Sequence, residues 1–79
     1  MTTEWKNIDN TLIKTFEFKG FSEAIAFVNK VADLSNSQDH HPNIEIFDYK
    51  YVKVKLTTHC EGNKVTEKDQ KLKEAIDLI

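Results

Sequence analysis

The chain has 79 residues, 39% of them hydrophobic, a formal net charge of −2 and a single cysteine, Cys60. This length supports one domain, residues 1–79, whose core is so small that we expect a partner subunit to reinforce it. The 11 basic and 13 acidic residues are mixed along the chain, which argues against a nucleic-acid or anionic-membrane surface. One cysteine excludes an internal disulfide, and no apolar run approaches the roughly 20 residues of a membrane helix, so we expect a cytoplasmic protein.

Two short runs rich in aromatic and β-branched residues open the chain, at residues 5–8 and 12–18. Asp9 and Asn10 lie between them, and both residue types tolerate the positive φ of a tight turn. The two runs therefore predict a β-hairpin. Lys14 interrupts the alternation of the second run, which suggests that this strand lies at a sheet edge.

Apolar residues then recur at three- and four-residue spacing, which predicts a helix from Phe21 to Ser35 with one apolar stripe. The positions of the stripe are Phe21, Ala24, Ile25, Val28, Val31, Ala32 and Ser35. Gly20 suits the position before the first turn, and Glu23 is favourable within that turn. The polar residues 36–39 are expected to end the helix. Pro42 requires that it has stopped, because the residue before a proline disfavours the helical conformation.

Two further runs, residues 44–49 and 51–58, predict two antiparallel strands that turn near Lys50. Thr66 follows a loop, and together with Asp69 it has the spacing of a capping box that starts a second helix. The order β-β-α-β-β-α predicts an α+β fold, a four-stranded antiparallel sheet with both helices on one face. The other face is left for solvent or a partner chain.

The three histidines lie in two places, with His40 and His41 just before Pro42 and His59 at the end of the last predicted strand. A hairpin that turns near Lys50 pairs residues whose numbers sum to roughly 100, so His41 is expected opposite His59. Imidazole can give or take a proton near neutral pH. Grouped histidines can therefore supply both the acid and the base of a dehydration without any cofactor.

Other interpretations of these residues stay open on spacing alone. A zinc site is disfavoured, because adjacent side chains of an extended segment point in opposite directions and His40 and His41 can hardly reach one metal. The His-His-Pro tripeptide could also be only the end of a helix. Tyr49, Tyr51 and Lys53 could stack on nucleic acid, but the acidic balance of the chain argues against this.

The histidine pattern resembles the signature of the pterin-4a-carbinolamine dehydratase family, which was also first noticed as a dimerisation cofactor of a homeodomain transcription factor. The motif residues are His40-His41-Pro42, Tyr49, Thr58-His59 and Asp69, and the resemblance extends from Trp5 to Asp77. It implies dehydration of 4a-hydroxytetrahydropterin (4a-hydroxytetrahydrobiopterin) to quinonoid dihydropterin, with no metal and no organic cofactor. This reaction recycles the pterin of aromatic amino acid hydroxylases. The resemblance also implies a homodimer or homotetramer.

By the same resemblance, His40 and His59 match the acid/base histidines, and His41 matches the histidine that assists or binds substrate. The resemblance implies that Pro42, Thr58 and Asp69 belong to the substrate-binding set, although Asp69 fits a helix cap better than direct catalysis.

Three departures from the family pattern stand out. An acidic–lysine pair is missing from residues 36–39, Ile44 replaces an aromatic residue, and one extra residue before Tyr49 predicts a bulge or longer turn near Phe47-Asp48. The rival hypothesis is a catalytically idle module of the same fold, which acts in protein assembly or in molybdenum-cofactor-related pterin metabolism.

Overall fold

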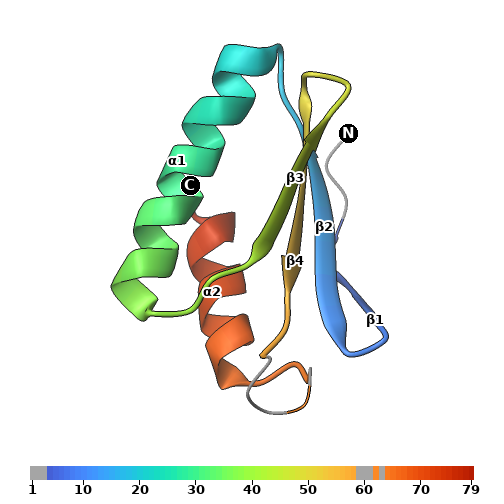
Figure 1. Cartoon of the computed structure of the whole chain (residues 1–79), viewed down its shortest axis with the longest axis vertical. Coiled ribbons are helices and arrows are strands. Elements are labelled where there is room, and N and C mark those ends of the chain that lie inside the picture. The colour runs from blue at the N-terminus through green and yellow to red at the C-terminus, as the bar shows by residue number, and fades with distance from the viewer. Residues whose placement is uncertain (1–3, 59–61, 63) are drawn as a thin grey trace.

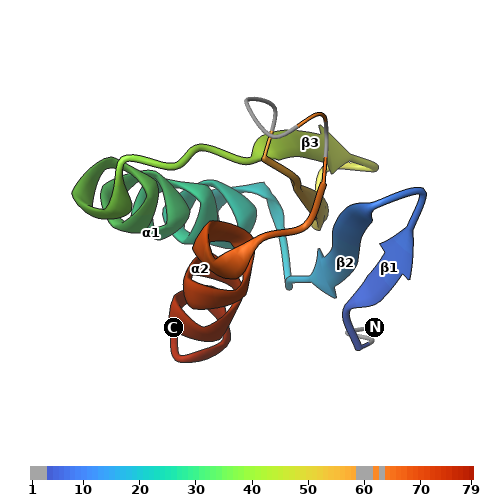
Figure 2. The ribbon, with the colours of Figure 1, turned by 90° about the horizontal axis from the view of Figure 1, so that it is seen from below.

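A four-stranded antiparallel sheet with two helices on one face makes up the computed structural model, which describes residues 4–58, 62 and 64–79 (Figure 1). The elements are β1 (Lys6–Ile8), β2 (Thr11–Glu17), α1 (Phe21–Gln38), β3 (Asn43–Phe47), β4 (Tyr51–Leu56) and α2 (Glu67–Asp77). The strands lie in the order β1-β2-β4-β3, and Figure 2 shows both helices on the same side of them. The predicted α+β fold and its element order are therefore confirmed. In the described ranges, no helix is both long enough and apolar enough to cross a membrane.

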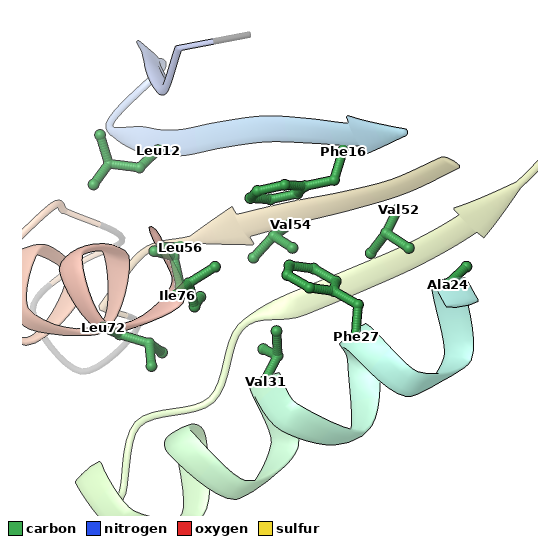
Figure 3. Packing of buried hydrophobic residues seen from close by; sticks show 10 residues of the cluster. All are labelled: Leu12, Phe16, Ala24, Phe27, Val31, Val52, Val54, Leu56, Leu72 and Ile76. Atoms are coloured by element: carbon green, nitrogen blue, oxygen red, sulfur yellow. The ribbon is translucent and has the colours of Figure 1, made fainter. Parts of the chain in front are cut away.

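The core lies between the helices and the inner face of the sheet (Figure 3). Its members are at most 9% exposed: Leu12, Phe16, Ala24, Phe27, Val31, Val52, Val54, Leu56, Leu72 and Ile76. The rings of Phe16 and Phe27 lie 4.6 Å apart between centroids, which joins β2 to α1. Burying one side chain of this size contributes about 1.5–3 kcal/mol, so this cluster is the main source of stability.

Two left-handed turns shape the strand pairs. Asp9 and Asn10 have φ of 51° and 61°, as expected for the tight turn between β1 and β2. Between β3 and β4 the turn contains three residues, 48–50, and both Asp48 and Tyr49 have positive φ. The sequence predicted a bulge or a longer turn near Phe47-Asp48, and the structure has this three-residue turn there.

The register of the β3–β4 pair differs from the expected one. Asn43 pairs with Lys55 and Phe47 pairs with Tyr51, so paired residues sum to 98 rather than to about 100. The reason is the left-handed turn, which is centred on Tyr49 instead of Lys50. The shift of two residues keeps every side chain on its predicted face, because side chains alternate with a period of two.

Lys14 does not mark a sheet edge, since β2 lies between β1 and β4. Its side chain lies on the core face, with Nζ 4.8 Å from the centroid of the Phe16 ring. The Lys14 ammonium group lies at the edge of the core, where Nζ contacts Asp77 Oδ1 at 3.0 Å. Trp5 Nε1 donates to the same carboxylate at 2.9 Å. This cluster connects Trp5, which precedes β1, and β2 to the end of α2.

Because of its hydrogen bonds, Asp77 is expected to make a small contribution to the stability of the fold that depends on pH. Partial burial would raise the pKa of Asp77, but the hydrogen bonds from Trp5 and Lys14 outweigh it and hold the pKa below its ordinary value of 3.8. A carboxylate with a lowered pKa stabilises the fold above its unfolded-state pKa, and this contribution is lost as pH falls through the folded-state pKa.

We therefore expect Asp77→Asn to lower the free energy of unfolding at pH ~7 by less than about 1 kcal/mol, since the carboxylate is partly exposed. Below the folded-state pKa the difference from wild type should shrink toward zero. Urea unfolding at pH ~7 and pH ~2 measures this. Asp33→Asn, the same change on the exposed side of α1, is the control and should show no such pH dependence. An equal loss at both pH values for Asp77→Asn would contradict the expectation.

Candidate active site

His40 is placed by the way α1 ends. The helix continues through the polar residues 36–38 and stops at Asp39, which has a φ of 51°. The Asp39 N–H donates to Asn36 O, and the His40 N–H donates to Ser35 O at 3.1 Å. This pair of bonds is the Schellman arrangement, in which one left-handed residue satisfies the last carbonyls of a helix. The helix α1 is thus three residues longer than predicted, and the turn that ends it positions His40.

Asp69 is placed by the way α2 begins. Its carboxylate is fully buried and lies three residues after Thr66, whose backbone N–H donates to Asp69 Oδ2 at 2.9 Å. The predicted capping box is therefore confirmed. A negative charge is favourable at this position, because the free N–H groups of a helix start carry partial positive charge.

The two helix ends meet through one short contact. His40 Nε2 lies 2.5 Å from Asp69 Oδ1, and the His40 side chain is 11% exposed. The Thr58 hydroxyl donates to Asp69 Oδ2 at 2.8 Å. Each carboxylate oxygen thus has a partner, as a buried carboxylate requires. Figure 1 shows why they meet: α1 and β4 end, and α2 begins, at the same end of the molecule.

His41 points to a different partner. Its Nε2 lies 2.9 Å from Asn36 Oδ1, in the last turn of α1, and the residue is exposed. The adjacent imidazoles therefore contact different helices. Pro42 follows, half-buried, and leads into β3.

The predicted alignment of His41 with His59 involves a residue outside the described part of the chain and stays a prediction, although the register on which it relied is shifted by two residues in the described β3–β4 pairs. Extrapolating the observed β3–β4 register places His41 opposite Thr57, and the ladder itself begins only at Asn43. His59 lies outside the described residues. Thr58 is described: it is 2% exposed, its N–H donates to Lys64 O at 2.9 Å, and its side chain points to Asp69.

Two partners of the predicted site residues were missed by sequence reasoning. Thr66 was expected only as a cap, yet its hydroxyl also lies 2.7 Å from Thr58 Oγ1. Asn36 was expected only to end the helix, yet it holds His41. The five-residue spacing between Asn36 and His41 would have signalled this contact only if the left-handed turn at Asp39 had been foreseen.

Two other kinds of site can be assessed among the described residues, a metal site and a groove. In that part of the chain, no three His, Cys, Asp or Glu side chains are grouped so that they could hold a metal ion. Two grooves lie elsewhere. One of about 660 Å³ is lined by α1 and the end of α2, and one of about 470 Å³ by β2, α1 and α2. Neither His40 nor His41 lines them.

Comparisons with known proteins identify the family of the chain as a whole. The family model described as pterin 4 alpha carbinolamine dehydratase matches residues 1–79. A protein of Picosynechococcus sp. that is named provisionally as a pterin-4-alpha-carbinolamine dehydratase is 47% identical over 76 residues, 96% of this chain and 80% of the relative. A relative with the same provisional name from Sulfolobus acidocaldarius is 43% identical over 75 residues, 95% of this chain and 80% of the relative.

Solved structures show the same fold. A crystal structure described as a transcriptional coactivator/pterin dehydratase from Brucella melitensis has a TM-score of 0.86 and 36% identity, and the match covers 94% of this chain and 79% of that one. A pterin dehydratase-like protein described as a RuBisCO assembly factor in the alpha-carboxysome has a TM-score of 0.73 and 25% identity, with 95% and 84% covered. With a family model that spans the whole sequence and relatives above 40% identity, the chain belongs to the pterin-4a-carbinolamine dehydratase family.

Proposed function

We propose that this chain catalyses the dehydration of 4a-hydroxytetrahydropterin to quinonoid dihydropterin by histidine acid/base chemistry. Family membership supports pterin carbinolamine dehydratase activity in general. The observation that carries the specific proposal is the His40–Asp69 contact, because a partly buried imidazole fixed by a carboxylate is suited to proton transfer. The proposed role is to recycle the pterin of aromatic amino acid hydroxylases.

The reaction needs one proton delivered and one removed. The C4a–O bond breaks as the hydroxyl is protonated and leaves as water, N5 loses its proton, and a C4a=N5 double bond forms. In our proposal His40 and His59 carry out these two proton transfers, one acting as the acid and the other as the base. His41, held by Asn36 and exposed to solvent, orients the pterin together with Pro42. No step requires a metal or an organic cofactor.

We expect His40→Ala and His59→Ala each to slow the dehydration by about 10²- to 10⁴-fold, the usual contribution of a positioned acid or base. Stopped-flow decay of chemically prepared 4a-hydroxytetrahydropterin, in buffer that contains EDTA, measures the rate above that of buffer alone. Gln70→Ala changes an exposed neighbour of Asp69 and is the matched control, with a rate close to wild type. If wild type and the His40→Ala/His59→Ala double variant give the same rate, the enzyme hypothesis fails. Loss of wild-type activity in EDTA that added metal restores would refute the metal-free mechanism.

A second candidate function is an assembly role without catalysis. It is favoured by the likeness to the pterin dehydratase-like protein described as a RuBisCO assembly factor. The same assay separates the two functions, because an assembly module has no reason to accelerate dehydration. Substrate turnover that depends on His40 would rule out the hypothesis that the chain is a catalytically idle assembly module.

We also propose that the chain is a homodimer or homotetramer. Several large apolar side chains are about half or more exposed, which is costly for a chain this small: Ile8, Phe21, Tyr49, Leu78 and Ile79. Sedimentation equilibrium at micromolar concentration should give two or four times the 9.2 kDa of one chain. A 9.2 kDa particle would contradict the proposal.

A further inference from the structure

We propose that Thr58 is a positioning residue, whose hydroxyl holds Asp69 so that His40 keeps its proton on Nε2 and offers Nδ1 to the pterin. The catalytic part of this inference rests on the proposed dehydratase function. The tautomer itself does not, and it can be measured independently.

Which group donates and which accepts can be assigned for each hydrogen bond around Asp69. An ionised carboxylate only accepts, so Thr58 must donate its hydroxyl proton to Asp69 Oδ2. The Thr66 hydroxyl, 2.7 Å from Thr58 Oγ1, must then be the donor in that pair. A directed chain thus runs from Thr66 through Thr58 to Asp69. Oδ2 receives this hydroxyl and the Thr66 N–H, which leaves Oδ1 for His40.

The contact with Asp69 also fixes the tautomer of His40. Oδ1 accepts from His40, so Nε2 carries a proton, and in the neutral ring the lone pair then lies on Nδ1. Within the described part of the chain, Nδ1 has no hydrogen-bond partner. Nδ1 is therefore the ring atom left to exchange a proton with a substrate, while Asp69 stabilises the imidazolium that forms when it accepts one.

Thr58 fits this role better than it fits substrate binding. The residue is 2% exposed, and its one hydroxyl proton already points at Asp69. Its backbone is held by paired hydrogen bonds with Lys64, of 2.9 Å and 3.4 Å. A buried hydroxyl on a fixed backbone can hold a carboxylate in one orientation, but it cannot turn toward a ligand without leaving Asp69 incompletely bonded.

The test compares three variants. Thr58→Val removes the hydroxyl at nearly constant volume, and Thr58→Ser keeps it. Thr57→Val is the matched control, because the neighbouring Thr57 is also buried but its hydroxyl donates to Asn10 O at 2.9 Å, outside the site. Each protein is examined by ¹⁵N NMR of the imidazole side chains, with His40→Gln used to assign the His40 signals, and by steady-state dehydration kinetics.

In wild type we expect neutral His40 to carry its proton on Nε2, shifted downfield and slow to exchange with solvent. Thr58→Val should lose this slow exchange and show a mixture of tautomers, with kcat lowered about tenfold or more and KM nearly unchanged. Thr58→Ser should restore both readouts to within about threefold of wild type. Thr57→Val should lose stability yet keep the wild-type His40 signal and kcat.

Three results would overturn the inference. One is a wild-type His40 protonated on Nδ1, which needs no variant to observe. Another is a Thr58→Val protein with an unchanged His40 signal and unchanged kcat, which would make Thr58 purely structural. The third is a raised KM with kcat intact, which would make Thr58 a substrate-binding residue. If wild type shows no dehydratase activity at all, the proposed function fails, and the imidazole spectra still decide the tautomer.

Discussion

The contacts of one buried carboxylate hold this structure together at its functional end. Asp69 is completely removed from solvent, and an unpaired charge in that position would be prohibitively costly. Its oxygens therefore require donors, and the donors come from three separate parts of the chain: the end of β4, the start of α2 and the segment after α1. Satisfying the charge forces these parts into one arrangement.

The rest of the fold brings these donors within hydrogen-bond distance of Asp69. The antiparallel pairing of β2 with β4 and the packing of α1 on the sheet set the positions of the strand end and the helix end. The left-handed residue Asp39 then turns the chain so that His40 approaches α2. At the opposite end of α2, Asp77 is bonded by Trp5 and Lys14, so both ends of this short helix are held by carboxylates.

Much of the fold could be predicted from the sequence because it depends on local patterns. Period-two alternation gave β4, three- and four-residue spacing gave α1, and the Thr66–Asp69 spacing gave the start of α2. Lys14 was misjudged because its partner, Asp77, lies 63 residues away, and alternation alone cannot show that a charge has a distant partner. The register was misjudged because it depends on the φ angles of the turn at Asp48 and Tyr49.

The candidate site was predictable only in part, for a related reason. The motif indicated His40, Thr58 and Asp69, but not that they bond to one another. Their contact depends on where α1 stops, and the helix continues three residues past the expected end before Asp39 breaks it. Polar residues do not stop a helix by themselves, whereas one residue in the left-handed conformation does.

The functional end of the protein depends on a direct and strong interaction between His40 and Asp69. A double-mutant cycle in urea unfolding, with His40→Ala, Asp69→Asn and the combined variant, tests it most directly. The contact predicts a coupling energy of about 1 kcal/mol or more, because the hydrogen bond joins a buried carboxylate to an imidazole. Additive losses, within about 0.5 kcal/mol, would show that the two side chains do not stabilise one another and would contradict the account.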